Sequence, residues 1–136
     1  MSAIPLPPAK AAGVFWLAIL AGALLTLIGV RFFVVPEGAV RTFGLPPDAG
    51  TVRDGLEAVI GLRDIWLGLM LVALAWFAEW RAVALWFLLA VGVCWADAGI
   101  VAANGGPRLA VGFHLGSGVY CLVASLMAWR LCSRNP

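Results

Sequence analysis

The sequence predicts an all-α, polytopic membrane protein that forms a bundle of four transmembrane helices. Composition gives the first two observations behind this fold class: 63% of the 136 residues are hydrophobic and only 12% are charged, and the mean hydropathy is +1.01. Both values lie far outside the range of soluble domains. Third, the chain contains four apolar stretches, each close to the length of about 20 residues that crosses a bilayer.

The four predicted spans form one domain that covers residues 1–136. They cover residues 11–35, 55–77, 82–103 and 109–129. The first span exceeds the apolar core of a signal peptide, which has about 7–15 residues, so we expect it to be retained. The connection around Glu79 to Arg81 is so short that the second and third spans must be antiparallel neighbours. Between the third and fourth spans, Gly105 and Pro107 provide a helix stop followed by a helix start.

Residues 36–54 are predicted to form a loop of unusual length. Prolines and glycines interrupt it, at Pro36, Gly44, Pro46, Pro47 and Gly50. Most connections are shorter, and longer ones often cover functional sites. We therefore expect this loop to fold over one end of the bundle as a lid.

Glycines recur at helical spacing within the spans. Small residues on one helix face allow close packing in membranes. The pairs are Gly22 and Gly29, Gly61 and Gly68, Gly92 and Gly99, and Gly112 and Gly116. They exceed what one four-helix core needs, so a homo-oligomer is expected.

The distribution of basic residues predicts the orientation of the protein. Four lie on the side of the chain termini and three on the opposite side, which predicts cytoplasmic termini by the positive-inside rule. The first group is Lys10, Arg81, Arg130 and Arg134, and the second is Arg41, Arg53 and Arg108. We expect an integral, multi-pass protein of the bacterial inner membrane. No basic tract indicates nucleic-acid binding.

Ionisable side chains inside the spans are predicted to form one polar layer. Counted from the helix ends on the side of the long loop, they lie about 6–14 Å deep at 1.5 Å per residue. The members are Arg31, Arg63, Asp64, Asp97 and His114. Helical spacing adds Glu57, Asn104, Ser117 and Cys121 to the same faces. Tyr120, one turn beyond Ser117, could bring a hydroxyl to the floor of the layer. An ionised side chain in hydrocarbon is costly unless it finds a partner or water, so this layer is the candidate functional site.

The layer has a structural explanation as well as a chemical one. Arg63 paired with Asp97 or Asp64 could simply hold the bundle together. Arg31 could extend to the headgroups, and Glu57 could be a first-turn acid favoured by the helix dipole. His114 could be a hydrogen-bonded core histidine.

Metal and cofactor sites are not predicted. The chain has one histidine, and its three cysteines, Cys94, Cys121 and Cys132, lack metal-ligand spacing. No cofactor is expected. A haem held between subunits through His114 is the alternative.

The second span contains Gly61-Leu62-Arg63-Asp64 followed by Gly68, and Asp97 lies near the end of the third span. In these features the chain resembles a family of small four-span membrane proteins of bacteria and fungi, a domain of unknown function akin in layout to the DoxX-like membrane proteins. The resemblance covers nearly the whole chain and implies a four-helix bundle without a settled activity. Fungal members neighbour natural-product pathways, and compact membrane bundles such as sterol isomerases use intramembrane acids. By analogy, this implies an enzyme acting on a lipophilic molecule.

We therefore expect a membrane-embedded enzyme or binder that acts on a small lipophilic substrate by acid/base chemistry, of the isomerase, cyclase or epoxide-opening type. Asp97 would be the general acid or base, with Asp64 as its partner. Arg63 would stabilise charge, and His114 would be a second proton carrier. The expected substrate-binding residues are Glu57, Trp66, Trp95, Asn104, Phe113, Ser117, Tyr120 and Arg31. The alternative is a non-catalytic transporter subunit or an accessory protein that binds a quinone or lipid.

Overall fold

The computed structural model describes residues 11–45 and 55–133, which form five α-helices and no strand. The helices are α1 (Ala12–Val34), α2 (Pro36–Phe43), α3 (Leu56–Trp76), α4 (Trp80–Ala103) and α5 (Arg108–Cys132). All except α2 are long and apolar enough to cross a membrane. The predicted fold class, a four-span all-α membrane protein, is confirmed.

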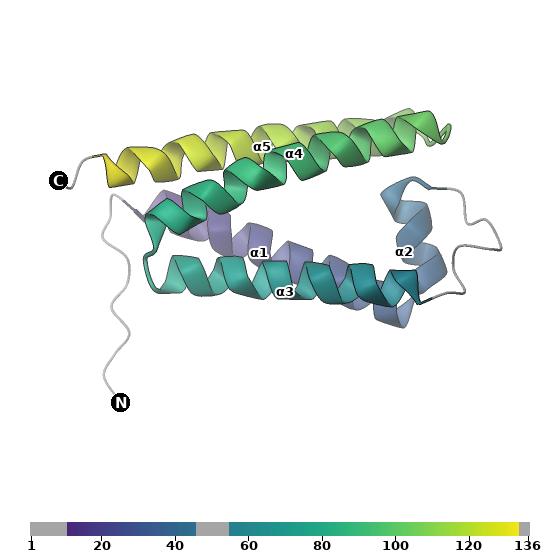
Figure 1. The fold of residues 1–136 in the computed structure, drawn as a ribbon, viewed down its shortest axis with the longest axis horizontal. Helices are drawn as coiled ribbons and strands as arrows, with labels where there is room; N and C mark the ends of the chain where they lie inside the picture. Colours follow the sequence, from purple (N-terminus) through teal and green to yellow (C-terminus); the bar gives the residue numbers. More distant parts are fainter. Residues whose placement is uncertain (1–10, 46–54, 134–136) are drawn as a thin grey trace.

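The four long helices pack as two pairs, α1 with α3 and α4 with α5 (Figure 1). In the first pair, glycines bring the two backbones together. A Cβ atom added at Gly22 would lie 2.7 Å from the carbonyl oxygen of Gly68, and one added at Gly29 would lie 2.5 Å from that of Gly61. The recurrence of glycine every seven residues therefore marks the contact face of this pair.

The second pair does not use its recurrent glycines in this way. An added Cβ meets no atom within 4 Å at Gly92, Gly99, Gly112 or Gly116. The expectation that these glycines pack helices within the chain is wrong. Instead, Trp95 of α4 lies against Gly118 of α5, and the buried Ser125 hydroxyl donates a 2.8 Å hydrogen bond to the Ala84 carbonyl.

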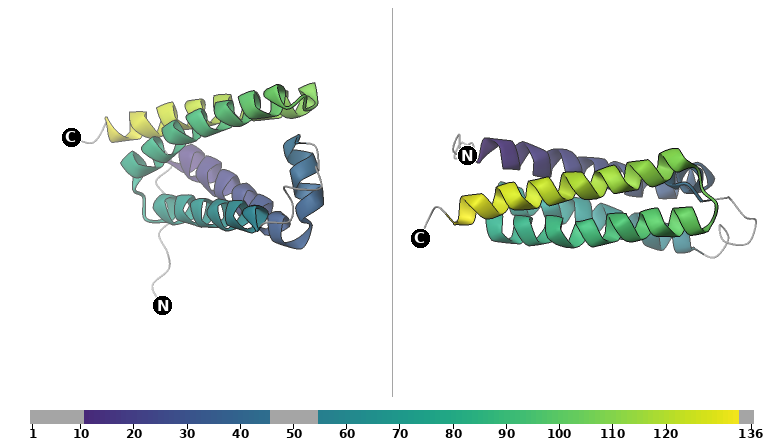
Figure 2. Two further views of the ribbon diagram at one scale, coloured as in Figure 1. Left: turned by 45° about the vertical axis from the view of Figure 1, so that its right-hand side comes forward. Right: turned by 90° about the horizontal axis from the view of Figure 1, so that it is seen from above.

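The two pairs form a wedge, because they meet at one end of the molecule and separate toward the other (Figures 1 and 2). The closed half lies beside the α3–α4 turn and contains the apolar core, where Leu71, Val83 and Phe87 are fully buried. Between the pairs, the Tyr120 hydroxyl of α5 donates a 2.7 Å hydrogen bond to the Leu17 carbonyl of α1. A short turn connects α3 and α4, yet α3 packs mainly against α1 and α4 packs mainly against α5.

The first part of the predicted long loop is a helix, which corrects that expectation. Pro36 occupies the first turn of α2, where its missing N–H costs nothing, and Gly44 ends the helix in the left-handed conformation at φ 104°. Helix α2 stands across the open end of the wedge, between the two pairs (Figures 1 and 2). The remainder of the predicted lid, residues 46–54, lies outside the described residues.

Candidate functional site

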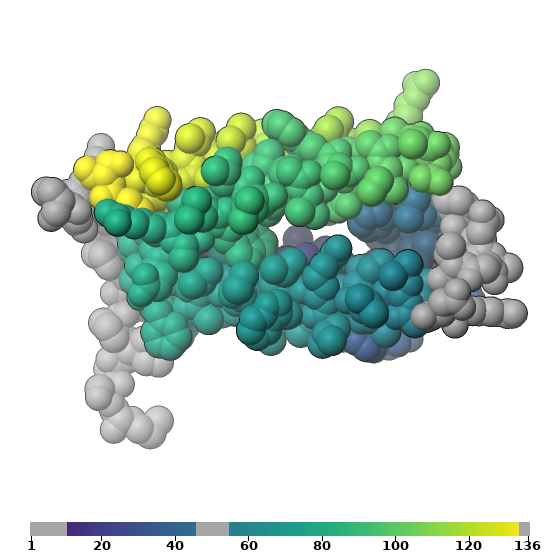
Figure 3. Space-filling model, viewed as in Figure 1, coloured from purple at the N-terminus to yellow at the C-terminus, as the bar shows by residue number. Residues whose placement is uncertain are grey.

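The predicted polar layer lies in the open half of the wedge. Asp64, Asp97 and His114 come from α3, α4 and α5, each about 9–12 Å along the helix from its end beside α2 at 1.5 Å per residue. Figure 3 shows a hollow between α3 and α4 in this half of the molecule. We call this hollow the cleft.

Four of the predicted side chains come together in this half of the molecule. The Asp97 carboxylate lies within charge–charge range of His114, Arg63 and Asp64. Asp64 and His114 are buried, with 7% and 9% of their surface exposed, and Asp97 is partly buried. Three helices from both pairs therefore contribute to one polar cluster.

Arg63 and Asp64 form an ion pair between consecutive residues of α3. The Arg63 Nε and Nη2 atoms lie 3.1 Å and 3.0 Å from Asp64 Oδ1. The Asp64 side chain is 9% exposed, whereas that of Arg63 is 53% exposed. An ion pair within one helix cannot connect two helices, so the structure does not support the interpretation of Arg63 as an interhelical staple.

Asp97 has a different environment. Among residues 11–45 and 55–133, no side chain or backbone group forms a hydrogen bond or an ion pair with its carboxylate. His114 and Arg63 lie near it but beyond direct contact. Within the described residues, the Asp97 carboxylate therefore has charged neighbours but no direct polar partner.

His114 links α5 to α2. Its Nε2 atom lies 3.0 Å from the carbonyl oxygen of Phe43, the last residue of α2. The centroids of the two rings are 4.6 Å apart. The sequence did not indicate Phe43 as a site residue, because a backbone carbonyl leaves no signature in the residue types.

Three predicted site residues lie outside the cluster. Arg31 is exposed and its Nη2 atom donates to the Gly38 carbonyl of α2 at 3.5 Å, as expected for a side chain that extends to the membrane surface. Asn104, at the end of α4, donates to the Ile100 carbonyl. Trp66 is 65% exposed and lies two residues from Asp64, which turns it to the opposite side of α3.

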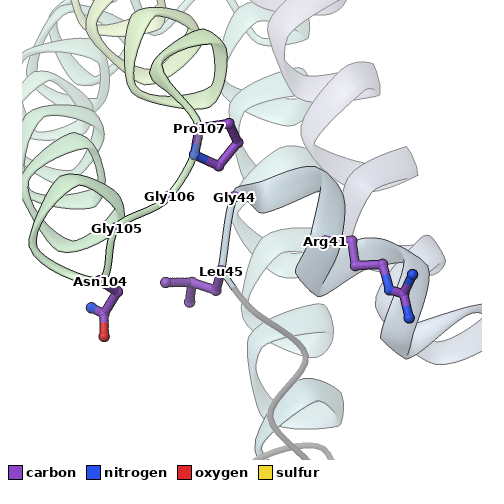
Figure 4. A pocket seen from close by; sticks show the side chains of 7 residues that line it. All are labelled: Arg41, Gly44, Leu45, Asn104, Gly105, Gly106 and Pro107. Atoms are coloured by element: carbon purple, nitrogen blue, oxygen red, sulfur yellow. The ribbon is translucent and has the colours of Figure 1, made fainter.

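Asn104 borders a separate small pocket at the end of the molecule (Figure 4). This pocket has a volume of about 210 Å³ and lies between the end of α2 and the α4–α5 turn. The side chains of Asn104 and Arg41 point away from each other (Figure 4). None of the four residues of the polar cluster lines this pocket, so it is distinct from the cluster.

Four further predicted residues lie on α3 and α5. Glu57 is 6% exposed in the first turn of α3, and Ser117 donates to the Phe113 carbonyl one turn earlier. The Phe113 ring lies 6.1 Å from the His114 ring. The Tyr120 hydroxyl donates its hydrogen bond to a carbonyl of α1, so this residue connects the two helix pairs.

No group of three histidine, cysteine or acidic side chains suited to a metal ion occurs within the described part of the chain. The Nε2 atom of His114 already faces a carbonyl. A haem iron at that nitrogen would have to displace Phe43.

Comparison with known protein families gives one match. The model of a family described as a domain of unknown function (DUF4267) matches residues 22–128, which contain most of the four spans and every residue of the polar cluster. No curated protein matches the chain, and no solved structure does. The chain is a small four-span membrane protein that belongs to the DUF4267 family.

Proposed function

We propose that the cleft binds a small lipophilic molecule and that Asp97 transfers a proton to or from it. The observation that carries this proposal is the contrast between the two aspartates. Asp64 is neutralised by its neighbour Arg63, whereas Asp97 faces the cluster without a direct partner among the described residues. Because an unpartnered carboxyl at this depth is costly, its presence favours a chemical role.

In this proposal the other three groups have supporting roles. His114, on the helix that packs against α4, is the second proton carrier, so that one group can donate while the other accepts. The half-exposed Arg63 guanidinium stabilises negative charge that develops on the substrate. Asp64 holds that guanidinium through the ion pair. Isomerisation, cyclisation and epoxide opening all need such a donor and acceptor pair.

The wedge shape supports access from the bilayer. The two helix pairs separate in the half that contains the cluster, so a lipophilic molecule can enter sideways between them. Phe113, beside the His114 ring, would provide an apolar wall near the cluster. Trp95 packs on Gly118 and lies two residues from Asp97, so it faces a different side of α4. Trp66, on the opposite side of α3, is not part of this proposal.

A non-catalytic role is the second candidate. A quinone- or lipid-binding accessory protein would use the same sideways opening. A transporter subunit would need a second route through the closed half, where Leu71, Val83 and Phe87 are fully buried. That packing counts against transport.

We also propose how the protein is arranged in the membrane. The positive-inside rule favours cytoplasmic termini in a bacterial inner membrane. The glycines on the outer faces of α4 and α5 remain open to a neighbouring molecule, which is compatible with a homo-oligomer.

The test is native mass spectrometry with lipid and small-molecule extraction of the purified protein. We expect wild type to carry a lipophilic molecule that is lost in Asp97→Asn and retained in Glu79→Gln. Glu79 is a suitable control because it is an exposed carboxylate in the α3–α4 turn. If wild type carries no molecule, and Asp97→Asn changes only the thermal stability, the proposal is wrong.

A further inference from the structure

The end of α2 and the candidate proton carrier His114 are in direct contact. The Phe43 carbonyl oxygen lies 3.0 Å from His114 Nε2, and their rings lie 4.6 Å apart. His114 is 9% exposed. A turn of the ring by 180° about Cβ–Cγ would put Cε1 in the place of Nε2, so it would lose the hydrogen bond to the Phe43 carbonyl.

The chemistry of this contact determines where the proton of a neutral imidazole lies. A backbone carbonyl can only accept a hydrogen bond, so the hydrogen must be on Nε2. In the neutral ring, Nδ1 then carries the lone pair. We propose that α2 is a positioning element of the site: the Phe43 carbonyl holds His114 in the Nε2–H form and so makes Nδ1 the nitrogen that accepts the proton.

The carbonyl can do this because the end of α2 is fixed between α4 and α5. Gly44, directly after Phe43, has φ 104°, a conformation that side chains with a Cβ rarely adopt. A Cβ at this position would lie 2.6 Å from the Ala110 Cβ and 2.9 Å from Val101 Cγ1. Glycine at position 44 thus allows both the turn and the close approach that brings the Phe43 carbonyl to His114.

The role of Nδ1 in proton transfer rests on the proposed function, whereas the tautomer does not. The two can therefore fail separately. Loss of a bound molecule in Asp97→Asn tests the function. The protonation of the two ring nitrogens tests the positioning by α2 without any substrate.

The experiment uses the fact that the 136-residue chain has a single histidine. Labelling with ¹⁵N-histidine gives one pair of ring-nitrogen signals from the full-length protein in lipid bilayers. At alkaline pH, where the imidazole is neutral, we expect Nε2 to be the protonated nitrogen. An Nδ1–H form, or an even mixture of the two forms, in wild type would overturn the proposal.

Two variants separate the carbonyl from the ring. Gly44→Ala should displace the Phe43 carbonyl and produce a mixture of tautomers, whereas Phe43→Leu keeps the carbonyl and should retain the Nε2–H form. The matched control is Gly55→Ala, because Gly55 also has a positive φ of 75° but an added Cβ would meet no atom of the described residues within 4 Å. A Gly44→Ala protein that folds and keeps a pure Nε2–H signal would contradict the proposal.

A second measurement on wild type covers the case in which Gly44→Ala does not fold. Phe43-Gly44 is the only Phe-Gly pair in the sequence, so ¹³C-carbonyl phenylalanine and ¹⁵N-glycine together identify the Phe43 carbonyl in solid-state NMR. Its dipolar coupling to His114 Nε2 should correspond to a direct hydrogen bond. Absence of this coupling in ordered wild-type protein would reject the contact and the proposal with it.

Discussion

The hydroxyl of Tyr120 on α5 donates a 2.7 Å hydrogen bond to the carbonyl of Leu17 on α1. The two helices belong to different pairs, and the bond lies at the edge of the closed half, where the Tyr120 ring also meets Phe87 at 6.2 Å. This contact therefore helps to hold the two pairs together beside the cleft.

Tyr120→Phe should destabilise the protein without emptying the cleft. The variant keeps the ring packing but loses the hydroxyl, so we expect the free energy of unfolding to fall by about 1 kcal/mol. Unfolding by SDS titration in mixed micelles measures this change. Ser133→Ala is the control, because Ser133 is exposed and bonds only within its own helix end. Equal stability of Tyr120→Phe and wild type would show that the bond does not hold the pairs together.

Glycines at the same spacing should differ in their tolerance of substitution. Gly22→Ala places a methyl group 2.7 Å from both the Gly68 carbonyl oxygen and Val72 Cγ2, and such overpacking costs about 1–3 kcal/mol. Gly92→Ala meets no atom within 4 Å and should leave the stability of the monomer unchanged or slightly higher. SDS titration compares the two variants. A similar loss of stability in both would contradict the α1–α3 packing, and a change in oligomeric state for Gly92→Ala alone would point to an interface between copies.

For the stability of the fold, loss of both Arg63 and Asp64 should cost less than loss of Arg63 alone. Arg63→Gln leaves the buried Asp64 carboxylate without its partner, and because Arg63 is half exposed we expect a loss of about 1–2 kcal/mol. Adding Asp64→Asn should recover most of this loss. A double-mutant cycle on the free energy of unfolding measures the coupling. If the double variant is less stable than either single variant, both residues have partners other than each other.

A hydrophobic carbodiimide should distinguish the two aspartates. Asp97 is partly exposed in the cleft, whereas Asp64 is 7% exposed and paired with Arg63. We expect dicyclohexylcarbodiimide, which partitions into the bilayer, to modify Asp97 several-fold more than Asp64, as read by peptide mass spectrometry. A water-soluble carbodiimide should instead modify Glu37 and Glu79, which are exposed outside the four spans. Preferential reaction at Asp64 would show that the cleft is not open to the bilayer as the structure indicates.

The sequence predicts the depth of a residue in the membrane better than the side of the helix that its side chain faces. Apolar length located the four spans, and the rise per residue placed Asp64, Asp97 and His114 in one layer. Which way a side chain turns depends on the partner that each helix selects. Trp66 was assigned to the pocket because of its depth, yet it faces away because α3 packs on α1 through Gly61 and Gly68.

Two other features could not be decided from the sequence alone, for a related reason. The helical form of residues 36–43 was hidden because Pro36 and Gly44, which usually indicate a loop, here start and end a short helix. For Arg31 the sequence left two alternatives, a member of the layer or a side chain that extends to the surface, and its contact with the Gly38 carbonyl favours the second. The pairing of α1 with α3 and of α4 with α5 depends on contacts between residues far apart in the sequence, which no local pattern predicts.

The wedge divides the protein unequally between the two leaflets of the membrane. With the four long helices across a bilayer, the closed half around Leu71, Val83 and Phe87 lies in the leaflet beside the termini, and the half in which the two pairs separate lies in the leaflet beside α2 (Figure 1). Under the proposed function, only molecules dissolved in the second leaflet would reach Asp97. The orientation of the chain during insertion would then decide which leaflet supplies the molecules that the protein binds.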